Sequence, residues 1–558
     1  MTLDLSLVRS NSDFSMNNTC VQVPRAHNEA VLDYAPGSSG RVALKAELGK
    51  FLSDHSEVPL VIGGRDVTTG ELGSCILPHE HQHQLAKYHR GNAETVDQAI
   101  ATAAAARPGW SEMAWESRAA IFLKAADLLA GRYRQKLNAA TMLNQSKTPH
   151  QAEIDAACEL IDFWRFNASY LPFIYGQQPA SAPGTWNYVE YRALEGFVFA
   201  VTPFNFTSVA GNLPTSPALM GNTVVWKPAS TAVFTAYWLI KLLEEAGLPP
   251  GVINLVPGNG EQIGNIALGH EDLAGVHFTG STGVFRSMLG VVGTNIAGYK
   301  NYPRVVGETG GKNFVFAHPS ADLDALVANL VRGAFEYQGQ KCSAASRAYI
   351  PESLWSRLHD RLRDEVESIK FGDVTDFTNF MGAVIDKAAF DKLRQYIDSA
   401  KMDSGADVIC GGGCDDSQGY FVAPTVIRAH DPYYTTMQTE LFGPILTVYV
   451  YKDADYADTL DLCDRTSPYA LTGAIFAQER TAIDLALGRL RQAAGNFYIN
   501  DKPTGAVVGQ QPFGGSRASG TNDKAGSSLN LYRWVSARTV KETFAPVDDY
   551  RYPFMEEC

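Results

Sequence analysis

Short apolar runs alternate with amphipathic stretches through the middle of the chain. The runs 196–201, 223–226, 252–256 and 276–278 are apolar, and Gly or Pro follows each of them. Between the second and third runs, residues 231–246 show helical spacing and end at Gly247, with Pro249 beyond. Strands that alternate with helices predict parallel βαβ units, which bind ligands at the carboxyl ends of their strands.

The flanking regions predict further elements. Residues 100–168 read as helical, with apolar positions at helical spacing in 119–129. Residues 172–192 are rich in Pro, Gly and aromatics and then alternate, which predicts an extended hairpin. A second α/β run spans about 311–500, and a strand-like stretch lies at 530–540. The fold class is therefore α/β, with more than one α/β part and a small additional unit.

Length and charge narrow the class of protein. A chain of 558 residues exceeds the size of one hydrophobic core, so at least two domains are expected. The net charge of −13 argues against a nucleic-acid partner, and no apolar run approaches the length of a membrane span. The first 20 residues contain Asp4, Asp13 and only Arg9 as a basic residue, a weak match to a transit peptide. We expect an acidic, soluble, multi-domain protein.

The cysteines indicate free thiols and no metal site. Eight are spread over the chain, and Cys410 and Cys414 have no second pair to complete a zinc site. Cys342 lies in the polar loop 339–343 beside Lys341, after a helix that we expect Ser320 to cap. This setting favours an exposed, thiolate-prone cysteine. Most cysteines are small buried hydrophobes, and for a single Cys that alternative is preferred.

Two glycine-containing loops, 257–260 and 278–283, each follow a predicted strand and precede a helix. Small residues there let backbone N–H groups approach a phosphate. The spacing of Gly258, Gly260 and Gly264 misses the dinucleotide fingerprint by one residue. Taken alone, an ordinary turn is the better interpretation of either loop.

Four segments in a fixed order change this balance. Residues 202–206, 307–312 and 440–444 stand around the Cys342 loop, and the combination resembles the aldehyde dehydrogenase superfamily over nearly the whole chain. Residues 334–344, 495–502 and 508–523 are most similar to the subfamily that oxidises L-glutamate gamma-semialdehyde to glutamate, a step of proline degradation. The resemblance implies a Rossmann-type cofactor domain, a second α/β catalytic domain and a small oligomerisation unit.

The resemblance also implies three catalytic residues. Cys342 is the nucleophile that forms a thiohemiacetal and then a thioester. Asn205 and the Cys342 backbone N–H donate to the oxyanion. Glu308 is the base that activates water, although a surface turn residue is the alternative for it.

The implied cofactor is NAD, with NADP not excluded. Lys227 and Glu440 would contact the two riboses, and Phe442 would pack near the nicotinamide. Several NAD-preferring relatives carry a Glu shortly after the lysine, and residues 227–230 have none. The residues expected along the pyrophosphate and nicotinamide ends are Thr202, Gly280, Ser281, Thr282, Gly283 and Val284.

The implied substrate is a short aldehyde with an α-amino acid head. Phe206 and Phe513 would clamp its aliphatic stem, and Glu159 would meet the ammonium. The expected carboxylate anchor consists of Ser343, Gly505 and Ala506. Some members of the family carry Ser where Ala506 stands, which bears on affinity because a backbone N–H can still bind there.

The implied organisation has four parts. Residues 1–21 form an N-terminal extension, 22–170 and 193–310 the NAD-binding domain, 311–505 the catalytic domain, and 171–192 with 506–558 the bridging unit. The family implies a homodimer, with higher homo-oligomers possible, and no nucleic-acid or membrane partner. It implies the mitochondrial matrix for a eukaryotic chain and the cytoplasm otherwise.

Three alternatives remain open. One is a dehydrogenase of another amino-acid-derived semialdehyde, and another is a binding or structural protein without catalysis. The third is a zinc hydrolase, because His79, Glu80 and His83 match H-E-x-x-H. That segment lacks the apolar face of a buried helix, so a solvated His-rich loop is the preferred interpretation.

Overall fold

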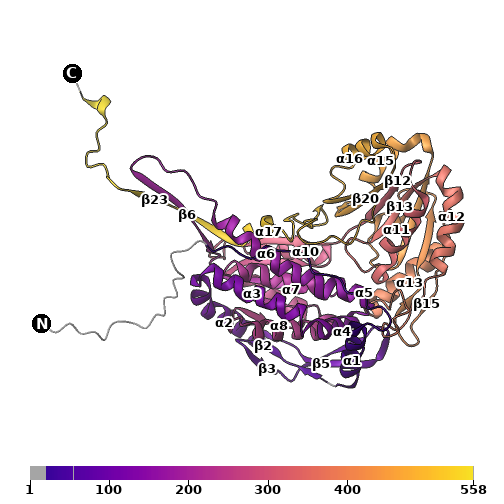
Figure 1. The fold of residues 1–558 in the computed structure, drawn as a ribbon, viewed down its shortest axis with the longest axis horizontal. Helices are drawn as coiled ribbons and strands as arrows, with labels where there is room; N and C mark the ends of the chain where they lie inside the picture. Colours follow the sequence, from indigo (N-terminus) through magenta and orange to yellow (C-terminus); the bar gives the residue numbers. More distant parts are fainter. Residues whose placement is uncertain (1–20, 55, 557–558) are drawn as a thin grey trace.

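The computed structural model describes residues 21–54 and 56–556, so the predicted extension 1–21 lies outside it except for its last residue. The ribbon has two lobes, each built around a seven-stranded sheet, and a two-stranded ribbon that projects from the first lobe (Figure 1). Among the described residues, no helix combines the length and apolarity that crossing a bilayer requires.

The first sheet has the order β11-β10-β7-β8-β9-β2-β3, and its strands β7 to β11 are parallel. All five residues of β8 are buried, as expected for a sheet covered on both faces. The predicted strands at 196–201, 223–226, 252–256 and 276–278 are confirmed. The bounds are β2 Leu60–Ile62, β3 Arg65–Val67, β7 Phe197–Val201, β8 Thr223–Lys227, β9 Ile253–Leu255, β10 Leu273–Thr279 and β11 Arg304–Glu308.

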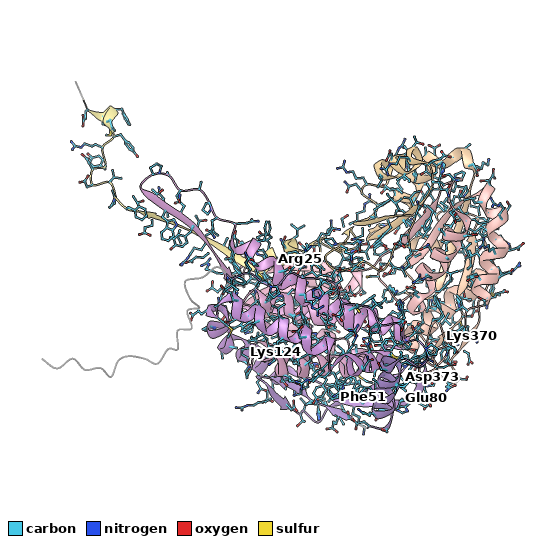
Figure 2. All side chains as sticks on the ribbon, in the orientation of Figure 1. Arg25, Phe51, Glu80, Lys124, Lys370 and Asp373 are labelled. Carbon is cyan, nitrogen blue, oxygen red and sulfur yellow. The ribbon has the colours of Figure 1, made fainter. Side chains whose placement is uncertain are left out.

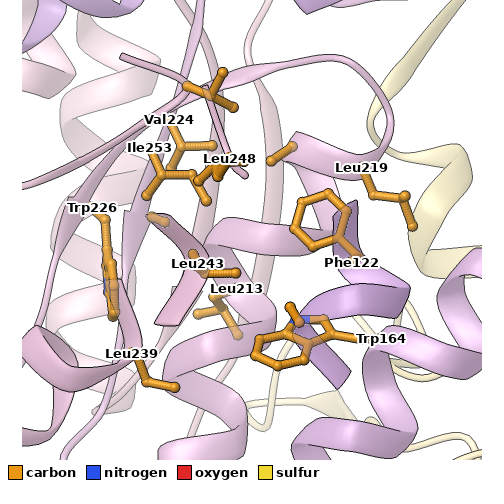
Figure 3. Close-up of a cluster of buried hydrophobic side chains, with 14 of the residues drawn as sticks. Phe122, Trp164, Leu213, Leu219, Val224, Trp226, Leu239, Leu243, Leu248 and Ile253 are labelled. Atoms are coloured by element: carbon orange, nitrogen blue, oxygen red, sulfur yellow. The ribbon is translucent and has the colours of Figure 1, made fainter. Parts of the chain in front are cut away.

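Helices cover both faces of this sheet. On one face, α3, α6, α7 and α8 enclose a core that contains Phe122, Trp164 and Trp226 (Figure 3). On the other, α2, α9 and α10 pack around a second core. The predicted helix 231–246 is confirmed as a 3₁₀ turn followed by α8, and Gly247 ends it at φ 102°. The bounds are α2 Ala93–Glu112, α3 Trp115–Ala130, α6 Leu160–Tyr175, α7 Thr207–Leu219, α8 Val233–Ala246, α9 Gly260–Gly269 and α10 Thr282–Thr294.

The second sheet has the order β14-β17-β18-β13-β12-β20-β21, and only β14 is antiparallel to its neighbour among these described strands. One face packs against α11 and α12, and the other against α15 and α16. The bounds are β12 Asn313–Ala317, β13 Ala345–Pro351, β14 Ala406–Cys410, β17 Thr425–Ala429, β18 Ile445–Tyr451, β20 Thr472–Phe476, β21 Asn496–Ile499, α11 Leu323–Phe335, α12 Glu352–Glu367, α13 Lys387–Met402, α15 Tyr456–Arg465 and α16 Arg480–Arg489.

The expected helix cap at Ser320 is wrong. Asp322 caps α11, because its side chain accepts a hydrogen bond from the Ala325 N–H. The Ser320 hydroxyl instead accepts from the backbone N–H groups of Gln478 and Glu479. It therefore ties the start of α11 to the loop before α16.

The N-terminal region adds α1 and a sheet of order β1-β5-β4 beneath the first lobe. These are followed by α4, α5 and a π-helical segment that runs directly into α6. The bounds are α1 Ser39–Ser53, β1 Ser56–Val58, β4 Leu72–Leu77, β5 Glu80–His89, α4 Arg134–Gln145, α5 Pro149–Ala152 and the π-helical segment Glu153–Glu159.

The H-E-x-x-H segment is neither a helix nor a loop. Glu80 begins β5, so the helix that a zincin requires is absent from these residues. His79 is buried, with Nδ1 3.2 Å from the Ser146 hydroxyl and Nε2 3.6 Å from the Asp373 carboxylate. Figure 2 labels Glu80, the first residue of β5, and Asp373 at the lower right of the molecule. No group of three His, Cys, Asp or Glu residues in 21–54 and 56–556 is arranged to hold a metal ion.

The predicted hairpin at 172–192 is wrong. The first part of that segment continues α6 to Tyr175, and β6 (Thr185–Ala193) pairs with β23 (Val535–Thr543) from the C-terminal end. The strand predicted at 530–540 is thus the partner of β6, preceded by the short helix α17 (Ser528–Tyr532). This β6–β23 ribbon extends away from the body of the molecule (Figure 1).

Candidate active site

Cys342 and Glu308 meet where the two lobes join. Glu308 is the last residue of β11, and Cys342 lies in the loop between α11 and β13. The Cys342 Sγ is 3.6 Å from the Glu308 Oε1, with the thiol as donor. The loop that carries Cys342 is sharply turned, because Tyr337, Gln338 and Gly339 all have φ between 52° and 65°. This turn is built into the 3₁₀ segment Glu336–Gly339.

The sequence predicts a thiolate-prone Cys342, but its surroundings favour the protonated thiol. Burial, and then the neighbouring carboxylates Glu308 and Glu440, hold the pKa of the Cys342 thiol well above its usual range. Lys341 does not counter this, because it is buried and its Nζ lies 3.0 Å from the Glu336 carboxylate. Without ligands, Cys342 is therefore a thiol at neutral pH, and it needs a base to ionise.

Glu308 is suited to be that base. Burial raises the pKa of its carboxyl to about 7, against a smaller lowering by the Cys342 hydrogen bond and by Lys524. A carboxyl that titrates near neutral pH can both accept and release a proton under ordinary conditions. The alternative of a solvated surface turn does not fit a side chain surrounded by protein.

Asn205 lies beside the Cys342 loop. Its Nδ2 donates to the Gln340 carbonyl oxygen at 3.0 Å, and the residue is buried in the loop between β7 and α7. The Cys342 backbone N–H has no acceptor among the described residues. The Asn205 amide thus contacts the loop that carries Cys342, and the Cys342 N–H is free of a backbone acceptor in the described part of the chain, so both are available as donors for an oxyanion.

A cavity of about 310 Å³ opens onto Cys342 and Glu308. It brings together the residues predicted to bind the substrate, which come from the end of the π-helical segment, the residue before α7, the Cys342 loop and the 505–513 segment. Those residues are Glu159, Phe206, Ser343, Gly505, Ala506 and Phe513. Phe513 is held by two backbone hydrogen bonds with Ala525.

Glu159 was expected to meet the substrate ammonium as a carboxylate, but its surroundings favour the protonated carboxyl. It ends the π-helical segment, accepts a hydrogen bond from the Ser208 hydroxyl at 2.8 Å, and burial together with Asp155 raises its pKa to about 8. In the ligand-free state at pH 7 the carboxyl is therefore mostly protonated. A cation bound beside it would stabilise the ionised form.

Lys502 and Thr504 also line the cavity, although the sequence analysis did not single them out as site residues. The Thr504 and Ser343 hydroxyl oxygens are 2.7 Å apart, and the Lys502 Nζ lies near Gly505. Within the described residues, the Lys502 ammonium has no ion-pair partner. The sequence signal that could have found them was position, because Lys502 ends the segment 495–502 that carried the resemblance and Thr504 directly precedes Gly505.

The residues predicted to bind the cofactor lie along the carboxyl edge of the first sheet, outside that cavity. Lys227 ends β8, and burial lowers the pKa of its ammonium to about 8. The Thr202 hydroxyl accepts from the Trp226 indole at 2.9 Å. Ser281 caps α10 by accepting from the Val284 N–H at 3.3 Å. The segment Gly280, Ser281, Thr282, Gly283 and Val284 thus forms a helix N-terminus that faces this edge.

Glu440 and Phe442 reach the same region from the second lobe. The Glu440 carboxylate accepts from the N–H of Gly311, three residues after Glu308, at 2.8 Å. Phe442 has φ 62°, and its ring stands edge-on to Phe204 at a centroid distance of 5.9 Å. A small hollow beside them is lined by Gly311, Gly339 and Ala345.

Two α/β lobes thus bring a cysteine, a carboxyl group that titrates near neutral pH and a helix N-terminus together around one junction. Comparison with known proteins gives the family. Residues 68–540 match the model of the aldehyde dehydrogenase family. This chain belongs to the aldehyde dehydrogenase family, and its fold is the α/β fold of that family.

Several relatives of high identity share one activity in their names. The chain is 53% identical to mitochondrial delta-1-pyrroline-5-carboxylate dehydrogenase of Dictyostelium discoideum, covering 96% of each chain. It is 47% identical to the mitochondrial human enzyme of that name, covering 95% of this chain and 94% of the relative. Among solved structures, delta-pyrroline-5-carboxylate dehydrogenase of Mycobacterium tuberculosis bound with NAD superposes with a TM-score of 0.94 at 54% identity, covering 97% of this chain and all of that one.

Proposed function

We propose that the protein oxidises L-glutamate gamma-semialdehyde, the open form of 1-pyrroline-5-carboxylate, to L-glutamate with NAD. The single observation that carries the proposal is the 310 Å³ cavity, which joins Cys342 and Glu308 to a two-phenylalanine clamp and a polar end at Ser343 and Gly505. Near-full-length relatives that carry this activity in their names support the choice of substrate.

Catalysis begins with activation of the thiol. Glu308 accepts the Cys342 proton across 3.6 Å, and the thiolate sulfur bonds to the aldehyde carbon. The carbonyl electron pair moves to oxygen, where the Asn205 Nδ2–H and the Cys342 N–H stabilise the negative charge. Removing one such donor costs about 3–4 kcal/mol of transition-state stabilisation in comparable sites.

The second half of the reaction releases the acid. NAD would supply the hydride acceptor when bound, and Cys342 would keep the oxidised acyl group as a thioester. After its proton has passed to solvent, Glu308 removes a proton from water, whose oxygen attacks the thioester carbon. The C–S bond breaks, glutamate leaves, and Cys342 recovers its thiol.

The residues fit a dinucleotide. Lys227 is a buried cation with no ion-pair partner among the described residues, and the first turn of α10 offers free N–H groups to a pyrophosphate. Glu440 would accept from ribose hydroxyls, with Thr202 and Phe442 toward the nicotinamide. We assign NAD because relatives of this name were solved with NAD bound.

The substrate's head group meets a polar pocket. Phe206 and Phe513 would clamp the aliphatic stem, and Ser343 with the backbone of Gly505 and Ala506 would bind the α-carboxylate. Glu159 would meet the ammonium.

We also propose the domain limits given above and a homodimer. If the chain is eukaryotic, we propose the mitochondrial matrix as its compartment, as in the relatives that are named mitochondrial.

NADH formation at 340 nm tests the proposal. With glutamate gamma-semialdehyde and NAD, the wild type should turn over, and Cys342→Ala should lose activity by a factor of at least about 10³ because the covalent route is gone. NADP in parallel measures the coenzyme preference. Turnover only with other semialdehydes would keep the mechanism and overturn the substrate. Activity that survives Cys342→Ala would overturn the mechanism.

A further inference from the structure

A buried ion pair lies directly behind the substrate cavity. The Lys147 Nζ and the Asp155 Oδ2 are 2.5 Å apart, and the two side chains are 1% and 0% exposed. Lys147 follows α4, and Asp155 belongs to the π-helical segment. Neither residue lines the cavity. Neither takes part in the chemistry proposed above.

Asp155 holds the start of α7. Its two carboxylate oxygens accept from the Thr207 N–H at 3.0 Å and the Ser208 N–H at 2.8 Å. The cap residue Phe206 makes no side-chain cap hydrogen bond, so Asp155 satisfies two of the N–H groups that the first turn leaves open. A negative charge there is also favoured by the helix dipole. Because Asn205 and Phe206 directly precede this turn, Asp155 fixes both of them.

Lys147 holds two aromatic rings that belong to different parts of the site. Its ammonium lies 4.2 Å from the Phe206 ring centroid and 4.4 Å from the Tyr337 ring centroid. Tyr337 begins the left-handed turn that leads to Cys342. The Phe206 ring also lines the cavity. One desolvated cation thus binds a cavity wall to the loop of the nucleophile, in the setting where cation–π attraction is strongest.

The pair also reaches Glu159. Ser208, whose N–H is fixed by Asp155, donates its hydroxyl to the Glu159 carboxyl at 2.8 Å. Lys147 lowers the pKa of Glu159, and Asp155 raises it. Removing the cation would therefore leave Glu159 more protonated and less able to meet an ammonium.

We propose that Lys147 and Asp155 are positioning residues for substrate recognition, which set the place of the Phe206 ring and of the first turn of α7 relative to the Cys342 loop. The inference rests on the proposed function only for its kinetic readout. The alternative is structural, in which Lys147 merely neutralises a buried Asp155.

Three variants separate these possibilities. Lys147→Met removes the cation at similar length, and Lys147→Arg keeps a cation that can still stack on aromatic rings. The double variant Lys147→Met/Asp155→Asn removes both charges, so that no lone buried charge prevents folding, while the amide oxygen of the substituted side chain can still accept from α7. Lys241→Met is the matched control, because Lys241 pairs with Asp66 at 2.8 Å and lies over the Tyr237 ring, away from the site.

Steady-state kinetics with glutamate gamma-semialdehyde should give a KM at least about tenfold higher in Lys147→Met and in the double variant, with a smaller change in kcat; tenfold corresponds to about 1.4 kcal/mol. Lys147→Arg should recover part of the loss, and Lys241→Met should match the wild type. A double variant with the wild-type KM would overturn the proposal, whether or not Lys147→Met folds.

Crystal structures of the variants test the positioning role independently of the proposed substrate. The Phe206 ring should shift or become disordered in the double variant and stay in place in Lys241→Met. An unmoved Phe206 ring would overturn the positioning role even if the wild type oxidises a different aldehyde. A wild type that fails on glutamate gamma-semialdehyde would instead overturn only the substrate.

Discussion

At the scale of single residues, the site depends on burial more than on charge. Lys341 is the cationic neighbour of Cys342 in the sequence, but it forms an ion pair with Glu336. This ion pair helps to lower the pKa of the Glu336 carboxyl to about 2. Burial disfavours a thiolate, and so do the Glu308 carboxyl, which lies 3.6 Å from the sulfur, and Glu440. In the proposed mechanism, activation of the nucleophile therefore falls to Glu308.

Glu308→Gln tests that role. Because burial raises the pKa of Glu308 to about 7, its basic form disappears as pH falls through that value, and hydrolysis of the thioester should slow with it. The variant should lose about 10²–10⁴-fold in turnover, and its remaining activity should lack the limb near pH 7. Single-turnover hydrolysis of the acyl-enzyme from pH 5 to 9 measures both effects. A variant that keeps the wild-type limb would assign the titration to another group.

At the scale of elements, the Cys342 loop depends on a glycine. Gly339 has φ 65°, and an added Cβ would lie 2.3 Å from the Gly443 carbonyl oxygen and 3.0 Å from the Ala334 carbonyl oxygen. Both contacts are with backbone atoms, which cannot move aside without displacing their segments. The backbone at Gly443 therefore passes this close to the loop only because residue 339 has no side chain.

Gly339→Ala should therefore displace the loop. We expect a loss of about 1–3 kcal/mol in the free energy of unfolding from the strained backbone, together with a kcat at least tenfold lower as Cys342 moves from Glu308. Chemical denaturation and steady-state assays measure the two effects. The control is Gly488→Ala in α16, where an added Cβ meets nothing within 4 Å. Wild-type kinetics in Gly339→Ala would show that the loop geometry is not critical.

At the scale of the whole molecule, the β6–β23 ribbon is incomplete by itself. A two-stranded ribbon is marginally stable in water, and this one leaves Trp186 55% exposed while projecting from the body (Figure 1). Its outer strand edges could pair with strands of a second copy of the chain, and its exposed side chains could pack against that copy. This is the physical basis for the homodimer proposed above.

Val540→Pro tests the role of the ribbon. Val540 is opposite Tyr188 in the register, and a proline there removes an N–H either from the pairing with β6 or from the outer edge. We expect the mass measured by light scattering after size exclusion to fall from dimer to monomer. Val547→Pro, at a residue that is 91% exposed beyond the ribbon, should leave the mass unchanged. A dimer that survives Val540→Pro would place the interface elsewhere.

The sequence by itself determined the α/β class, the core strands of the first sheet and the family. It did so because buried parallel strands are continuous apolar runs, as in β8, and because the segments around Cys342 keep a fixed order. The residues that it proposed for the substrate do meet in one cavity. Local periodicity and turn chemistry are sufficient for the class and the strands, whereas the family and the substrate residues came from the resemblance of the ordered segments.

Only the tertiary structure decided the partners of these segments. Alternation predicts that β6 is a strand, but it cannot say that β23, far along the chain, pairs with it. The polarity of residues 79–83 could not reveal β5, and the sequence neighbour Lys341 could not reveal that Cys342 faces carboxylates. Protonation and pairing depend on what burial brings together, and that is a property of the folded chain.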